Sequence, residues 1–209
     1  MQMLTAKGMC IVLFLEINKR SSDYSLNCHS FQWRNRGISR NAENYILVYI
    51  NESEVVILQT VKIANWLLEV DPERTKEFYK NVKAEEVCDC LYCLNFAEAS
   101  KSLDPAVLQL LQQLGLVPEM PAHLADIPIS DDKMIRYYTG NYHFVGRVLE
   151  GEVSKLSDWD ETNTLQLNNF KIGISEKIKF GPENFPQPIL QLDFETDLPW
   201  VLEEEPEEL

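Results

Sequence analysis

Three cysteines lie close together in the sequence, where Cys88, Cys90 and Cys93 form a Cys-x-Cys-x2-Cys pattern. Thiolates are soft ligands that suit zinc or iron–sulfur clusters. If the segment is helical, Cys90 and Cys93 lie on one face at positions i and i+3, with Cys88 at or before the helix start. A helix N-terminus also lowers the pKa of a thiol, which favours metal binding. The spacing therefore allows a zinc site.

A tetrahedral zinc site needs four ligands, and this cluster offers three. Our first choice for the fourth is His143, and Cys28 and His29 are alternatives if the N-terminal region is native. A simpler interpretation needs no cofactor, because free cysteines pack as small hydrophobic side chains. A redox or nucleophilic thiol is a third interpretation.

The histidines and paired carboxylates offer weaker signals for catalysis. His143 lies between Tyr142 and Phe144 in a strand-like segment, so the two aromatic side chains should share one face and the imidazole the other. We expect a surface or hydrogen-bonded histidine, with a general base as the alternative. His123 is predicted to lie in a loop. Residues 158–161 (Asp-Trp-Asp-Glu) are interpreted as a polar turn, because acid–base catalysis needs two carboxyl groups in contrasting environments.

The composition excludes several classes of protein. The chain has 209 residues with 45% hydrophobic residues and a net charge of −14, which excludes a wholly disordered acidic chain. The negative charge argues against binding to nucleic acid or anionic membranes. The longest apolar run, residues 9–15, is a buried-strand candidate, since a membrane helix needs about 20 residues. Five cysteines, an odd number, indicate reduced thiols and a cytoplasmic protein.

Composition also divides the chain. Residues 1–60 carry a slight positive charge and long polar stretches, so we interpret them as a poorly ordered or non-native N-terminal extension. Residues 61–202 are predicted to form a single α+β domain. Residues 203–209 form an acidic tail, in which five of seven residues are glutamate.

Helix signals come mainly before strand signals in this domain. The Asp-Pro pairs at 71–72 and 104–105 predict helix starts, and Gly115 predicts a left-handed helix end. The segregation favours an α+β fold, with an N-terminal helical part packed on a mainly antiparallel sheet. The expected helices are 72–80, 90–100 and 105–114; the expected strands are 45–50, 55–61, 134–138 and 142–149 with a hairpin turn at 139–141, one or two strands in 165–174, and a half-buried strand at 190–194.

Four segments carry a resemblance to known sequences: CDCLYCLNF (88–96), GNYHFVGRVL (140–149), FKIGIS (170–175) and PILQLDFETDLPWVL (188–202). Together they resemble a family of bacterial proteins from gut Gram-positive bacteria and their mobile elements. The resemblance covers about residues 61–209. It implies no activity and assigns no catalytic residue.

Three functional hypotheses follow. The first is a non-enzymatic cytoplasmic protein-binding domain, whose acidic surface attracts a basic protein partner. The second is a small zinc-binding domain, in which the cysteine cluster ties the helical part to the sheet. The third is a hydrolase that uses His143 in a concave pocket beside a carboxylate or a thiol.

Overall fold

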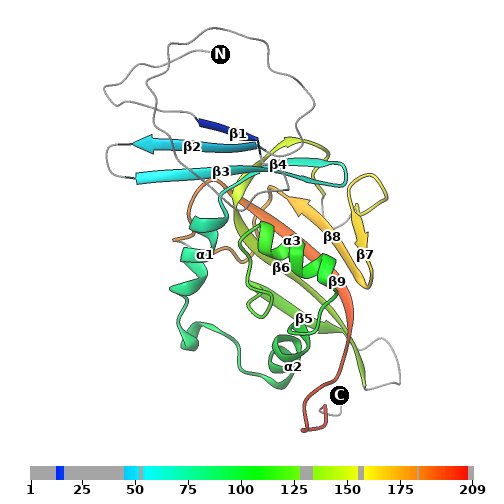
Figure 1. Ribbon diagram of the computed structural model, residues 1–209. Coiled ribbons are helices and arrows are strands. Elements are labelled where there is room, and N and C mark those ends of the chain that lie inside the picture. Colours follow the sequence, from blue (N-terminus) through cyan, green and yellow to red (C-terminus); the bar gives the residue numbers. More distant parts are fainter. Residues whose placement is uncertain are drawn as a thin grey trace, which may run out of the picture.

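The computed structural model describes residues 13–16, 45–51, 54–127, 134–154, 158–182 and 184–206, with only the backbone described before residue 58. Every strand pair in these residues is antiparallel, and three α-helices accompany the sheet. The predicted α+β class with a mainly antiparallel sheet is thus confirmed (Figure 1).

Nine strands form the sheet in the order β1-β2-β3-β4-β6-β9-β8-β7, and β5 also pairs with β6. The helices are α1 (Pro72–Lys80), α2 (Leu91–Ser100) and α3 (Pro105–Gln113), with a short 3-10 helix at Ala84–Glu86. The strands are β1 (Leu13–Glu16), β2 (Tyr45–Asn51), β3 (Glu54–Ile63), β4 (Trp66–Val70), β5 (His123–Ile127), β6 (Ile135–Glu150), β7 (Leu165–Leu167), β8 (Phe170–Ser175) and β9 (Ile189–Pro199).

Helices α1 and α3 begin where the Asp-Pro pairs predict. The Asp71 carboxylate accepts a hydrogen bond from Arg74 N at 3.0 Å, and Asp104 accepts one from Ala106 N at 2.8 Å. Both are N-caps followed by proline, which lacks the N–H that would otherwise need a partner. Gly115 follows α3 with φ +75°, as predicted for a left-handed end.

The predicted hairpin turn at residues 139–141 is wrong. These residues continue a single strand, β6, which runs for 16 residues. Gly140 is explained by packing: a Cβ there would lie 2.5 Å from the carbonyl oxygen of His123 and 2.7 Å from the Phe194 ring. A glycine required by close approach of a neighbouring strand therefore resembles a turn signal in the sequence.

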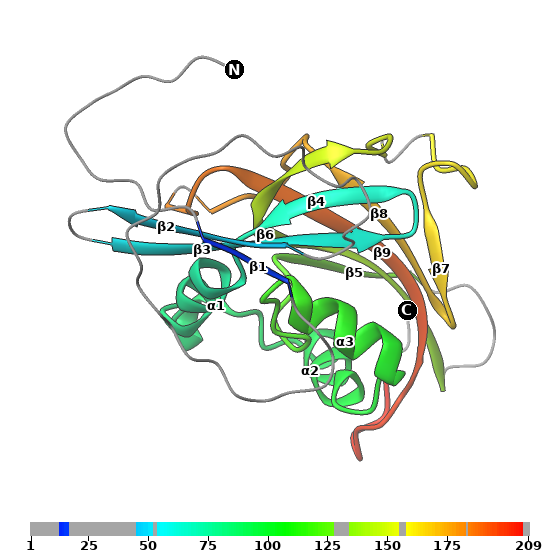
Figure 2. The same cartoon turned by 45° about the horizontal axis from the view of Figure 1, so that its top comes forward.

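The core lies between the sheet and the helices. Tyr142 and Phe144 of β6 and Phe194 of β9 are fully buried, and the Phe96 ring of α2 stacks on Phe194 with centroids 5.5 Å apart. Val107 of α3 belongs to the same cluster. Figure 2 shows α1, α2 and α3 on one side of the sheet. Burial of this aromatic face supplies the main driving force for folding.

Helix α1 fills a gap in the hydrogen bonding of β6. Strand β6 pairs with β5 up to residue 141 and with β4 from residue 146, which leaves the backbone between them without a strand partner on that edge. The Tyr79 hydroxyl donates to His143 O at 3.0 Å and accepts from His143 N at 3.2 Å. Thr75 Oγ1 accepts from Val145 N, and Asp71 N donates to Val145 O, both at 2.9 Å.

Replacing Tyr79 with phenylalanine is expected to lower the free energy of unfolding by about 2 kcal/mol, because it leaves the buried N–H and C=O of His143 unpaired. Chemical denaturation monitored by circular dichroism measures the change. Tyr137→Phe is the control, since its hydroxyl bonds to Glu195 in a more accessible position. Equal losses in the two variants would contradict the bridging role of Tyr79.

The N-terminal part of the chain is described only in part. Strands β2 and β3 form the predicted hairpin, and the predicted boundary at residue 60 falls inside β3. The proposed N-terminal extension otherwise lies mostly outside the described residues, as do residues 207–209 of the acidic tail. No helix in the described part of the chain is long and apolar enough to cross a membrane.

Candidate metal centre

The structure brings the three predicted cysteines together. Cys90 is the N-cap of α2, and Cys93 lies in the first turn of that helix. Cys88 lies two residues before Cys90. The three Sγ atoms lie within 4.8 Å of one another. Cys88 and Cys90 are exposed, whereas Cys93 is half-buried. The backbone turn into α2 therefore directs three thiols toward one point at the protein surface.

Hydrogen bonds within the cluster make its thiols unequal. The pKa of Cys88 is lowered, first by the backbone N–H of Cys90 and then by the thiols of Cys93 and Cys90. The pKa of Cys93 is raised, first by burial and then by its hydrogen bonds to the other two sulfurs. The lowered pKa favours a thiolate at Cys88 over one at Cys93, and a bound cation would favour loss of the remaining protons.

The cluster is anchored to the end of the sheet through Asn95, two residues after Cys93. This fully buried amide accepts from Val201 N at 2.7 Å and donates to Pro199 O at 3.2 Å. It also donates to the hydroxyl of Tyr138 at 3.0 Å. Helix α2 is consequently fixed against the segment that follows β9 (Figure 1). Sequence reasoning missed this role, because an asparagine within a helix carries no local signal of a distant partner.

His143 does not join the cluster as the predicted fourth ligand. It lies outside the group of side chains whose ligand atoms come within 4.8 Å of one another. Its ring is fully buried and packs edge-on against Phe185, with centroids 6.0 Å apart. Its Nε2 lies 3.1 Å from both Lys179 O and Gln191 Oε1. Hydrogen bonds through Nε2 and burial against Phe185 hold this histidine away from the cysteine cluster. The alternatives Cys28 and His29 lie outside the described residues.

A buried polar network surrounds His143. Gln191 Oε1 accepts a hydrogen bond from Lys179 N at 2.7 Å, which identifies this atom as the amide oxygen. Because an oxygen of this kind can only accept, Nε2 of His143 must carry a proton to bond to it. Gln191 Nε2 then donates to Asp193 Oδ1 at 2.6 Å. Burial lowers the pKa of His143 and raises that of Asp193 to about 6, against the effects of Gln191 and Lys179. A half-buried strand was predicted at residues 190–194. This prediction is wrong about the polar face of the strand, because Gln191 and Asp193 are both buried.

Three acceptor atoms in this network have no hydrogen-bond partner among the described residues: His143 Nδ1, Asn141 Oδ1 and Asp193 Oδ2. Asn141 and Asp193 face each other directly in the β6–β9 register. Protonation of Asp193 would turn one of these unpaired acceptors into a donor, which is consistent with its raised pKa.

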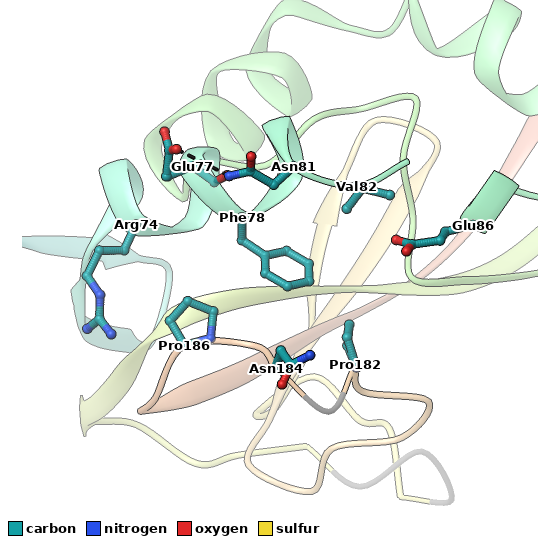
Figure 3. A pocket seen from close by; sticks show the side chains of 9 residues that line it. All are labelled: Arg74, Glu77, Phe78, Asn81, Val82, Glu86, Pro182, Asn184 and Pro186. Atoms are coloured by element: carbon teal, nitrogen blue, oxygen red, sulfur yellow. Dashed lines mark hydrogen bonds between the residues drawn. The ribbon is translucent and has the colours of Figure 1, made fainter. Parts of the chain in front are cut away.

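A groove of about 690 Å³ lies between α1 and the loop before β9. Figure 3 shows the Phe78 side chain directed toward this loop, with Glu77 and Asn81 hydrogen-bonded on the helix. Neither His143 nor any cysteine lines the groove. The geometry that the hydrolase hypothesis requires, with His143 in a concave pocket, is absent from this groove. Its lining residues are Arg74, Glu77, Phe78, Asn81, Val82, Glu86, Pro182, Asn184 and Pro186.

The remaining predicted residues have structural roles. In the polar turn at residues 158–161, Asp160 Oδ1 accepts from Thr162 N at 2.7 Å, and its hydrogen bonds lower its pKa. His123 lies in β5 rather than in the predicted loop, because it pairs with Asn141 of β6. Its ring stacks on Phe180 with centroids 4.1 Å apart.

The cysteine cluster is the strongest candidate site. No family model, curated protein sequence or solved structure matches this chain. Among the described residues, the three cysteines are the only group of three or more His, Cys, Asp or Glu side chains close enough to share a metal ion. The function must therefore be inferred from the chemistry of this cluster.

Proposed function

We propose that this chain is a metal-binding domain in which Cys88, Cys90 and Cys93 hold one thiophilic ion, zinc under cellular conditions. The observation that carries the proposal is the approach of all three Sγ atoms to within 4.8 Å. Sulfur ligands at about 2.3 Å from a tetrahedral zinc ion are roughly 3.8 Å apart. Rotation of the exposed Cys88 and Cys90 side chains would be needed to bring the sulfurs from within 4.8 Å to that spacing.

The donor set fits a soft ion. Thiolates favour zinc or copper(I) over magnesium or calcium, which take oxygen ligands. The N-terminus of α2 adds backbone N–H groups that stabilise negative charge on the sulfurs. Acidic neighbours have the opposite effect on a free thiolate, since the charge of Asp89 raises the pKa of Cys88. A bound divalent cation would remove this repulsion.

The expected consequence of metal binding is local stability. An ion shared by Cys88, Cys90 and Cys93 would fix the start of α2 to the segment before it. Asn95 already joins α2 to the end of β9 and the residues that follow it. The ion would therefore connect the segment before α2 to the sheet through this helix. This role needs no catalysis. Reduced thiols are also the basis on which we propose a cytoplasmic location.

Metal analysis of the full-length chain, purified without added metal or chelator, tests this proposal. A Cys10→Ser, Cys28→Ser variant leaves only the three cluster thiols to be counted. We expect about one zinc per chain, with the thiols protected from an alkylating reagent until a chelator is added. Absence of metal, together with rapid reaction of the exposed thiols, would overturn the proposal.

A further inference from the structure

Exposed apolar side chains flank the cysteine cluster in the sequence, and others lie on the segments that are hydrogen-bonded to α2 and to the end of β9. Val87 and Leu94, on either side of it in the sequence, are 41% and 46% exposed. Val201 is 45% exposed and is held beside α2 by its hydrogen bond to Asn95. Trp200 N donates to Met134 O, which brings the start of β6 to the same end of the fold. We call these exposed side chains the apolar rim: Val87, Leu94, Met134, Ile135 and Val201.

Acidic side chains border the apolar rim in the sequence. Exposed carboxylates precede the cluster at Glu85 and Glu86, and Asp89 lies within it between Cys88 and Cys90. A second acidic run, residues 203–205, follows Val201 and is exposed too, and Trp200 Nε1 holds this run in place by donating to Glu204 O at 2.7 Å. An apolar patch with a charged border is typical of a protein interface.

We propose that a basic protein partner docks on the apolar rim and supplies the fourth metal ligand from its own histidine or cysteine. This inference rests on the proposed metal-binding function. Zinc needs four ligands when its site is closed, and the described residues bring three side chains within ligating distance of one another. The exposed Cys88 and Cys90 sulfurs leave the ion accessible from outside. A partner ligand would complete the coordination within the interface.

The charge of the chain favours such a partner over a second copy of itself. Each copy carries a net charge of −14, so two copies repel each other, and a basic partner is attracted. A second copy would also bring three thiolates to a position that needs one ligand. A partner with one histidine or cysteine between apolar and basic residues satisfies both requirements.

The full-length chain loaded with cobalt(II) tests this inference, because the visible spectrum of cobalt reports the ligands around it. The probe is a capped peptide, Lys-Leu-His-Leu-Lys, and the matched control has alanine in place of histidine. We expect saturable changes in the cobalt d–d bands with the histidine peptide only. An acidic analogue, Glu-Leu-His-Leu-Glu, should bind at least about tenfold more weakly at low salt.

A variant of the apolar rim separates docking from metal binding. Leu94→Asn, which removes the apolar side chain without adding charge, should weaken peptide binding about tenfold and leave the thiolate-to-cobalt charge-transfer band unchanged. A chain that shows no charge-transfer band at all would contradict the metal-binding function itself. The other outcome is a normal charge-transfer band together with d–d bands that do not change when roughly 1 mM histidine peptide is added. That result would overturn only the partner inference. If Cys28→Ser or His29→Ala then restored the response, the fourth ligand would come from the chain itself.

Discussion

Replacing Cys93 with serine is expected to lower the affinity of the chain for zinc by at least about 100-fold, since losing a hydrogen-bond partner of a ligand already costs 10- to 100-fold. A serine hydroxyl does not ionise near neutral pH, so two thiolates would remain. Competition with a chromophoric zinc chelator measures the affinity. Cys88→Ser and Cys90→Ser should have effects of similar size, because the three sulfurs form one group.

Leu94→Ser provides the matched control for this prediction. It introduces the same side chain at the next position of α2, where the native residue is exposed and carries no ligand atom. Its zinc affinity should stay within about twofold of the native value. A chelator should also lower the melting temperature of the native chain but not that of Cys93→Ser. Equal zinc affinities for the native chain and Cys93→Ser would rule out the cluster as the site.

Replacing Asp193 with asparagine is expected to stabilise the chain at high pH relative to low pH. The pKa of Asp193 is raised to about 6 in the folded protein, mainly by burial, compared with about 3.9 for an unfolded aspartate. The native chain therefore loses stability as the pH rises from about 4 through 6. Two pH units correspond to about 3 kcal/mol, so the advantage of Asp193→Asn should grow by about that amount between pH 4 and pH 8.

Urea denaturation of both proteins across this pH range measures the difference. His143 has a lowered pKa, so its contribution to the free energy of unfolding is lost as the pH falls. Because both proteins contain His143, this contribution largely cancels in the comparison. Asp197→Asn is the control, because it removes an exposed carboxylate from the same strand. Parallel stability curves for the native chain and Asp193→Asn would show that Asp193 titrates as an ordinary aspartate.

Local sequence signals predicted the helices well. Asp71 and Asp104 accept capping hydrogen bonds, and Gly115 has the left-handed conformation that ends α3. Such signals depend on the backbone and on neighbours within one turn, so they can be recognised without tertiary structure. The thiol cluster is of the same kind. Its three members lie at the start of one helix, and their spacing alone brings them together.

Two predictions that depended on distant neighbours were wrong. Gly140 indicated a turn, yet it accommodates the His123 carbonyl oxygen and the Phe194 ring. Gln191 and Asp193 indicated a solvent-facing edge, yet both are covered and linked to His143. Burial of a polar strand face depends on the loops that pack over it, and a two-residue alternation contains no information about those loops.

Zinc K-edge X-ray absorption on the full-length chain, purified with its native metal, tests the central claim most directly. We predict about three sulfur neighbours at about 2.3 Å and one lighter neighbour at about 2.0 Å. This result would assign the ion to Cys88, Cys90 and Cys93, since no other group of side chains in the described residues brings three sulfurs together. A zinc ion surrounded only by nitrogen and oxygen would contradict the account.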